Sequence, residues 1–295
     1  MQCSKCQRDA IVFQSYSGLH LCGQHLIADV EAKAKKRIRT QGLLKTGDHI
    51  SVVLSGDTNS SALLYFLKQL TAERRDIRIS AISINKGMGD HNDRSHAKRI
   101  AELLDTECFT GSSQGEQVAV TDDIAQKTKG FSGSPYCYQH RFLLQEKVAY
   151  QHGITKIALA KSLDDAAGAV LESVLRGDVE RLDGKSGPKT IPRICPFISI
   201  TAAEIFLYAA LCGFGEGETL SPEQGNGLHK DTIAMLDNFT SNHPATKYAL
   251  LNLGENLANS PGRITGLIQA CEWYGRYSQE CGDDDSLREV MNGTY

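Results

Sequence analysis

Short apolar runs alternate with segments of helical spacing through the middle of the chain. The strand candidates are Ile50 to Leu54, Ile77 to Ile84, Glu107 to Thr110 and Ile157 to Ala160. After the first of them, from Ala62 to Leu70, apolar residues recur with the spacing of an amphipathic helix. This βαβαβ alternation predicts an α/β fold with a doubly wound parallel sheet, whose ligands bind at the carboxyl ends of the strands.

The remaining pattern divides the chain into four parts. A small unit at residues 1–28 precedes a basic helical linker at 29–48, the α/β domain at 49–230 and a helical C-terminal segment at 231–295. Within the α/β domain, Ile194 to Ile198 predicts a short strand. Thr201, with Glu204 three residues later, predicts a capping box for the helix that ends near Cys212.

The turn after the first strand combines small and polar residues with the start of a helix. Its sequence is Ser55-Gly56-Asp57-Thr58-Asn59-Ser60. In such a turn the first N–H groups of the helix point outward and the helix dipole favours negative charge, which is the geometry of a phosphate site. The same residues also fit an ordinary strand-to-helix turn capped by a short polar side chain. The pattern leaves both interpretations open.

Four residues near the N-terminus have the spacing of zinc ligands. The two pairs are Cys3-x-x-Cys6 and Cys22-x-x-His25. Together they can complete a closed, structural, tetrahedral site. Between the pairs, Ala10 to Phe13 and Leu19 to Leu21 predict a hairpin that turns at Ser17-Gly18. A unit this small has little core, so a metal would largely fold it. The alternative is that these are incidental cysteines of a reduced protein.

Composition excludes several classes of protein. No apolar run approaches the length of a membrane span, and the N-terminal residues lack the pattern of a signal peptide. The formal net charge of −3 argues against a bulk basic surface for nucleic acid. Nine cysteines without a secretory signal indicate a reducing compartment, so we expect a cytoplasmic protein with no membrane partner.

Two charged features each allow two interpretations. The linker helix carries six cations, namely Lys33, Lys35, Lys36, Arg37, Arg39 and Lys45. They form either a solvated helix face or an arm that contacts phosphates. Asp164 and Asp165 begin a later helix, where they are either partners of the helix dipole or polar groups that face the cleft at the strand ends.

Taken in order, these motifs resemble a known family. The set consists of the CxxC…CxxH finger, a strand with a Ser-Gly loop, SxxC before a helix, LDD at 163–165, LRGD at 175–178 and HPxxK at 243–247. It looks like the tRNA 2-thiouridine synthetases of the PP-loop ATP pyrophosphatase superfamily, both the single-chain archaeal and bacterial enzymes and the eukaryotic cytosolic pair of thiolation subunits. The resemblance covers nearly the whole chain and implies a Rossmann-like fold. In that family ATP adenylates a tRNA uridine, and sulfur delivered through an iron–sulfur cluster or a persulfide on three cysteines replaces the AMP.

The resemblance implies a site for ATP and magnesium at the loop, but the loop departs from the family. Where the family has SGGKDS, this chain has Asp57 in place of the second glycine, Thr58 in place of the lysine and Asn59 in place of the aspartate. Threonine cannot neutralise phosphate as lysine does. A carboxylate ~4 Å from a phosphate costs roughly 4 kcal/mol at an effective dielectric constant of ~20. Magnesium could offset this repulsion, although asparagine is a poorer ligand for it than a carboxylate.

Several residues are placed at the nucleotide by this resemblance. They are Ser55, Gly56, Asp57, Thr58, Asn59, Ser60, Lys161, Asp164 and Asp165. Among them, Lys161 could supply phosphate charge from a direction other than the loop.

The sulfur-handling cysteines are also incomplete. The resemblance places them at three positions where this chain has Ser134, Cys137 and Ser221. Serine is not a thiolate, so it neither holds iron nor carries a persulfide. We therefore expect no iron–sulfur cluster and a single structural zinc site at the N-terminus. The family's second finger retains only Cys271 and Cys281, so we expect no zinc there.

Three functions remain as hypotheses. The first is a catalytically degenerate paralogue, a pseudoenzyme, that acts in tRNA 2-thiolation as a partner or tRNA-binding subunit. The second is an ATP-dependent enzyme that adenylates tRNA uridine and acts as a sulfurtransferase with a donor not held on its own cysteines. The third is a zinc-finger protein-interaction module unrelated to tRNA. The expected partners are tRNA, an active thiolation synthetase or a sulfur-carrier protein, and we expect a homo- or heterodimer.

Overall fold

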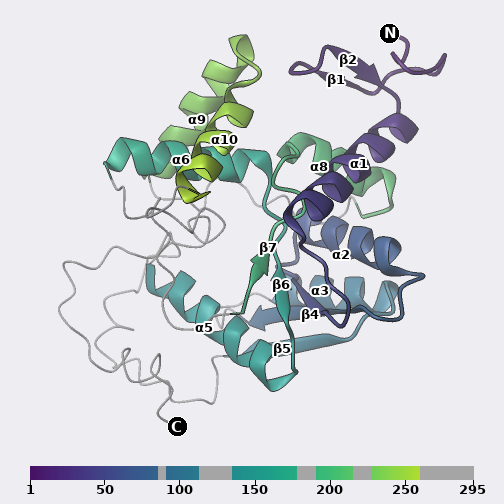
Figure 1. Cartoon of the computed structure of the whole chain (residues 1–295), viewed down its shortest axis with the longest axis vertical. Helices are drawn as coiled ribbons and strands as arrows, with labels where there is room; N and C mark the ends of the chain where they lie inside the picture. Colours follow the sequence, from purple (N-terminus) through teal and green to yellow (C-terminus); the bar gives the residue numbers. More distant parts are fainter. Residues whose placement is uncertain (86–90, 113–134, 178–190, 215–226, 260–295) are drawn as a thin grey trace.

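A parallel sheet organises the main part of the protein. The structure, a computed structural model, describes residues 1–85, 91–112, 135–177, 191–214 and 227–259. Five strands lie in the order β5-β4-β3-β6-β7, and all neighbours are parallel (Figure 1). Their bounds are β3 His49–Val53, β4 Arg78–Asn85, β5 Cys108–Ser112, β6 Lys156–Ala158 and β7 Arg193–Ile194.

Helices cover both faces of this sheet, and each face has its own apolar core. The helices are α2 Thr58–Thr71, α3 His91–Leu103, α5 Pro135–Gln151, α6 Leu163–Arg176 and α8 Ala202–Leu211. One core joins Ile50 of β3 to Phe66 of α2 and Tyr208 of α8. The other joins Ile157 of β6 to Ala166 of α6. The prediction of a doubly wound α/β fold is confirmed.

The sheet reverses its winding at β3. From β3 the chain builds β4 and β5 on one side, then crosses back to place β6 and β7 on the other. In open α/β sheets such a reversal leaves a crevice outside the carboxyl ends of the two adjacent strands. The loop after β3 and the segment after β6 therefore border the same crevice.

A two-stranded antiparallel hairpin precedes the sheet. It consists of β1, Val12–Gln14, and β2, Leu19–Leu21, and its turn contains Gly18 with a φ of 70°. The helix α1, Gly23–Gln41, follows directly. The basic helical linker predicted at residues 29–48 therefore begins earlier, at Gly23, and its helix ends sooner, because Gly42 adopts the left-handed conformation that closes a helix.

Two C-terminal helices pack against α6. They are α9, Gly227–Asn242, and α10, Thr246–Asn259, which lie beside α6 in Figure 1. The approach is close at Gly168 of α6, where an added Cβ would lie 2.6 Å from Cδ1 of Ile233. In the ranges that the structure describes, no helix has both the length and the apolar character that crossing a membrane requires.

The last strand is shorter than its prediction. The sequence predicts a strand from Ile194 to Ile198, whereas β7 has only the two residues Arg193–Ile194. The residues that follow form a turn, and Phe197 and Ile198 are buried in it. Pro196 has no N–H to donate to a strand ladder, so the apolar run contributes to the core without extending the sheet.

A nearly buried ion pair fixes the start of β3. The ammonium of Lys156 lies 2.6 Å from Oδ2 of Asp48. Burial raises the pKa of Asp48, but hydrogen bonds from Lys156 and from the N–H of Lys45 outweigh burial and hold it below its usual value. An acid whose pKa is lowered by folding stabilises the protein above its unfolded pKa of about 4, and this contribution is lost as the pH falls.

We expect Asp48→Asn to lower the free energy of unfolding at about pH 7 by roughly 2–4 kcal/mol, because Lys156 loses its carboxylate partner. The difference from wild type should shrink toward about pH 3, because there the carboxyl of Asp48 is already protonated in the unfolded chain, whose pKa is about 4. Urea unfolding at both pH values measures this. The control Glu107→Gln breaks an exposed ion pair with Arg78 and should cost less than about 1 kcal/mol. If the difference in unfolding free energy between wild type and Asp48→Asn persists unchanged at low pH, the stabilisation does not come from the ionised carboxylate of Asp48.

Candidate metal centre and nucleotide loop

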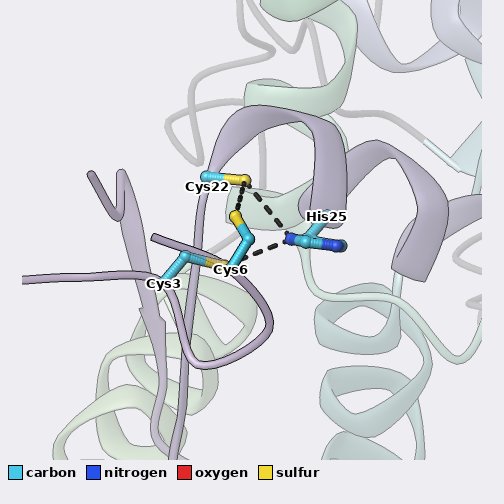
Figure 2. A group of neighbouring side chains, drawn as sticks. All are labelled: Cys3, Cys6, Cys22 and His25. Atoms are coloured by element: carbon cyan, nitrogen blue, oxygen red, sulfur yellow. Dashed lines mark hydrogen bonds between the residues drawn. The ribbon is translucent and has the colours of Figure 1, made fainter. Parts of the chain in front are cut away.

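Four side chains at the N-terminus converge on one point. Cys3 and Cys6 lie in the turn that precedes β1. Cys22 is the N-cap residue of α1, and His25 lies in the first turn of that helix. Figure 2 shows the three sulfur atoms and Nδ1 of His25 directed toward one another. All four ligand atoms lie within 4.8 Å of one another.

The distances between these atoms fit one tetrahedral zinc ion. The sulfur atoms of Cys6 and Cys22 are 3.7 Å apart. Nδ1 of His25 lies 3.2 Å from the sulfur of Cys3 and 3.4 Å from that of Cys22. Zinc bonds of about 2.3 Å to sulfur and about 2.0 Å to nitrogen would place tetrahedral ligands about 3.5–3.8 Å apart. The four residues therefore fit a structural zinc site with no open position.

The surroundings of Cys3 favour its thiolate form. Burial raises the pKa of this thiol, but hydrogen bonds from the N–H groups of Lys5 and Cys22, and then from His25, outweigh burial and lower the pKa to about 6. The N–H of Lys5 lies 3.4 Å from the sulfur. Since the thiolate is the form that binds metal, the turn that contains Cys3 is suited to bind a cation.

A buried carboxylate connects this finger to the α/β domain. Glu204 of α8 is 3% exposed and forms the predicted capping box with Thr201. One of its oxygens accepts hydrogen bonds from the side chains of Gln14 and Tyr16 of the hairpin. The ammonium of Lys33 lies 3.2 Å from the same oxygen. Burial, together with the neighbouring Glu204 carboxylate, raises the pKa of Tyr16 well above its usual range, so its phenol remains a hydrogen-bond donor.

The turn after β3 contains a carboxylate that accepts hydrogen bonds from other residues of the same turn. Gly56 has the positive φ, 84°, that this sharp turn requires. Asp57 is the N-cap of α2 and is 8% exposed. Its Oδ1 accepts the N–H of Ser60 at 2.6 Å, and its Oδ2 accepts the hydroxyl of Ser55 at 2.5 Å. The hydroxyls of Ser60 and Ser61 donate to the carbonyl of Asp57 at 3.1 and 3.0 Å.

The loop borders the crevice at the switch point of the sheet, where such folds bind ligands. Lys161, in the segment after β6, borders the same crevice and is half-buried. The N-terminus of α2, however, already interacts with the Asp57 carboxylate, as in an ordinary capped turn. A phosphate would have to displace that carboxylate or lie beside it.

The two carboxylates at the start of α6 have structural partners. Asp165 completes a capping box and accepts the N–H and the hydroxyl of Ser162, both at 2.8 Å. Asp164 accepts the N–H of Ala202 at 2.6 Å and the ammonium of Lys247 at 2.5 Å. Asp164 therefore ties α6 to α8 and α10, a role for Lys247 that the sequence did not reveal.

The six cations predicted for the linker, in α1 and the segment after it, divide into two groups. The paired ones are Lys33, Lys35 and Arg37, each within reach of a carboxylate. The other three are Lys36, Arg39 and Lys45, which are exposed. Within the described ranges these three take part in no ion pair, so they remain available for an external anion.

Several predicted site residues fall outside the described residues. They are Ser134, Ser221, Cys271 and Cys281. Cys137 belongs to the first turn of α5, but the structure does not describe its side chain. Among the described residues, the finger supplies the group of side chains with metal-ligand geometry.

Two family profiles match the chain, and together they run from the finger to just beyond α8. The N-terminal LIM domain of the 2-thiouridine synthetase TtuA matches residues 2–27, which include the four clustered ligands. The PP-loop domain matches residues 27–215, which contain the parallel sheet and the β3–α2 turn.

Relatives of the chain include tRNA 2-thiolation proteins. The tRNA 2-thiolation protein NcsA of Haloferax volcanii is 28% identical over 284 residues, which cover 89% of this chain and 88% of the relative. The tRNA-5-methyluridine(54) 2-sulfurtransferase of Pyrococcus horikoshii is 27% identical and covers 84% of this chain and 80% of its own length. A solved structure of U34-tRNA thiolase NcsA from Methanococcus maripaludis matches with a TM-score of 0.77 at 24% identity, covering 92% of this chain and 95% of its own.

The Methanococcus thiolase corrects one prediction. That structure contains a [4Fe-4S] cluster, so our expectation of no iron–sulfur cluster is wrong. The expectation counted thiolates only at the positions of Ser134, Cys137 and Ser221, whereas the chain has nine cysteines. Iron–sulfur clusters take thiolates from whichever segments the fold brings together. The two serines therefore do not exclude a cluster.

We expect the purified protein to hold one zinc ion per chain and to lose it in the variant Cys22→Ser, because a closed tetrahedral site needs all four ligands. Elemental analysis measures the zinc. Since the metal largely folds so small a unit, its loss should also release the bonds from Gln14 and Tyr16 to Glu204. Faster amide hydrogen exchange in the first turn of α8 would report that release.

The matched control is Cys108→Ala, because Cys108 lies on β5 and outside the cluster. This variant should keep the full zinc content and the exchange protection of α8. Zinc retained after Cys22→Ser, or lost after Cys108→Ala, would contradict the site.

Proposed function

The chain belongs to the PP-loop domain family, and from this membership we propose that it acts in tRNA 2-thiolation as a tRNA-binding subunit that does not itself consume ATP. The pathway is that of its relatives, which are tRNA 2-thiolation proteins and sulfurtransferases. The feature that distinguishes this chain is the carboxylate of Asp57 at the N-terminus of α2.

The proposal rests on Asp57, because its carboxylate already interacts with the positive N-terminal end of α2, where a phosphate would otherwise bind. A helix N-terminus presents roughly half an elementary positive charge. Here the carboxylate already sits 2.6 Å from the N–H of Ser60. A phosphate oxygen ~4 Å from that carboxylate would be repelled by roughly 4 kcal/mol at an effective dielectric constant of ~20. This amounts to about a thousandfold in affinity, and Thr58 offers no compensating charge.

The exposed cations of α1 and the segment after it support tRNA as the ligand. Lys36, Arg39 and Lys45 are exposed and remain outside the ion pairs of the described residues. Clustered Lys and Arg neutralise the phosphates of nucleic acids, and this contact needs no ATP. Because the net charge of the chain is −3, binding would depend on this local group and not on the surface as a whole.

Two other roles depend on specific features. An adenylating enzyme would use Lys161 at the crevice for the phosphates, and ATP binding would favour it. A protein-interaction role is favoured by Ile11 and Phe13, which are 49% and 55% exposed on the finger. The subunit that we propose would accordingly pair with an active thiolation synthetase or a sulfur-carrier protein, as a homo- or heterodimer.

The triple variant K36A/R39A/K45A should weaken tRNA binding and its dependence on salt. Each phosphate contact contributes about 0.7–0.9 to the slope of log affinity against log salt, so the slope should fall by about 2–3. Fluorescence anisotropy with labelled tRNA over a series of salt concentrations measures the slope.

The control is the double variant K35A/R74A, which removes two cations that are already paired with carboxylates. Its slope should equal that of wild type. The absence of tRNA binding by wild type, or an unchanged slope in the triple variant, would overturn the tRNA-binding role and leave the protein-interaction role.

A further inference from the structure

Three exposed cations of α1 and the segment after it form no ion pair with the described part of the chain. They are Lys36, Arg39 and Lys45, and we call them the linker cations. Other carboxylates that approach α1 are already engaged, since Asp29 pairs with Lys33 and Glu31 pairs with Lys35, each at 2.7 Å. Within the described ranges, the charge of the linker cations is therefore uncompensated.

The C-terminal end of α10 lies beside the linker cations. Oε1 of Glu255 is 2.5 Å from Nη1 of Arg37, and both side chains are largely buried. Arg37 lies between Lys36 and Arg39 on α1. Asn259, the last residue of α10, follows Glu255 by four residues, which is about 6 Å along a helix. The chain beyond α10 therefore starts close to the linker cations.

The sequence beyond Asn259 carries the opposite charge. Residues 280–289, which we call the acidic segment, contain five acids and one cation and so have a formal charge of −4. These residues are Glu280, Asp283, Asp284, Asp285, Glu289 and Arg288. The run from Asp283 to Asp285 is the only one of three consecutive acids in the sequence. Blocks of like charge are typical of segments that bind a partner of opposite charge.

The connection is long enough for the two groups to meet. Twenty-four residues lead from Asn259 to Asp283, and each can span up to about 3.3–3.6 Å. The whole of α1, with 19 residues, is only about 28 Å long. A single exposed ion pair is weak and is screened by salt. Attachment to the same chain, however, raises the effective concentration of the acidic segment at the cations, up to the millimolar range.

We propose that the acidic segment binds the linker cations of the same chain and thereby competes with the phosphates of tRNA. Carboxylates and phosphates are both oxyanions that Lys and Arg bind through charge-assisted hydrogen bonds, so the same cations serve either ligand. The contact itself needs no tRNA, whereas the competition rests on the tRNA-binding function proposed above. A tRNA displaces the segment because each of its phosphates adds to the electrostatic attraction.

Carbodiimide cross-linking of the full-length, zinc-loaded protein tests the contact, because this reagent joins a carboxylate directly to an amine. At about 20 mM salt we expect amide links from residues 283–285 to Lys36 or Lys45. Their yield should be several times that at Lys98, an exposed lysine of α3. At about 1 M salt, where the Debye length is about 3 Å, this preference should disappear.

One variant removes a linker cation without removing a reactive amine. Arg39→Ala should lower the yields at Lys36 and Lys45 about twofold, whereas Arg75→Ala, which removes an exposed cation after α2, should leave them unchanged. An equal mixture of isotope-labelled and unlabelled protein identifies the source of the segment. Links that mix the two isotopes would assign the contact to a second copy and overturn the proposal. Equal yields at Lys98 would also overturn it.

Binding of labelled tRNA tests the competition. The full-length variant D283N/D284N/D285N should bind tRNA about three- to tenfold more tightly than wild type at low salt, because phosphates no longer have to displace carboxylates. The gain should shrink as the salt concentration rises, since salt already screens the internal contact in wild type.

The matched control is D9N/E73Q/D231N, which neutralises three exposed acids in the finger, after α2 and in α9. It changes the net charge equally and should alter the affinity by less than about twofold. Equal gains in the two variants, or no gain in D283N/D284N/D285N, would overturn the competition. If neither wild type nor D283N/D284N/D285N binds tRNA, the proposed function fails, and the cross-links still decide whether the acidic segment binds the linker cations.

Discussion

The N-terminus of α2 can accept one negative charge, and in this protein a side chain of the chain itself supplies it. The Asp57 carboxylate takes the N–H of Ser60 and the hydroxyl of Ser55, at the switch point of the sheet. In a fold whose ligands bind at such a crevice, the residue at the N-cap decides whether a polyanion can enter. The Asp57 carboxylate caps the helix, and in the function that we propose it would also oppose a phosphate at this site.

The finger and the α/β domain form one unit because a second carboxylate joins them. Glu204 is buried, and without the donors of Gln14, Tyr16 and Lys33 its charge would be uncompensated. Two of those donors belong to the hairpin, whose own core is small and whose folding depends on metal. Metal binding at Cys3, Cys6, Cys22 and His25 would thereby be coupled to α8.

Local patterns allowed much of this to be predicted from sequence. The period of apolar residues predicted the strands and helices, the spacing of Cys3, Cys6, Cys22 and His25 predicted that these four residues come together, and Thr201 with Glu204 predicted a capping box. Contacts between distant segments could not be predicted in this way. Gln14 and Glu204 are 190 residues apart, and Lys247 reaches Asp164 across 83 residues, with no local signal for either pair. The expectation of no iron–sulfur cluster was also wrong, because it rested on the residue types at three loop positions, whereas the Methanococcus thiolase structure contains a cluster.

The most direct test of this account is calorimetric titration of the full-length, zinc-loaded protein with ATP and magnesium, beside the variant D57G/T58K. If the Asp57 carboxylate occupies the anion site, wild type should give no detectable heat. The variant frees the helix N-terminus and restores a lysine, so it should bind ATP about a thousandfold more tightly than wild type. Micromolar binding of ATP by the wild-type protein would contradict the account and identify the chain as an adenylating enzyme.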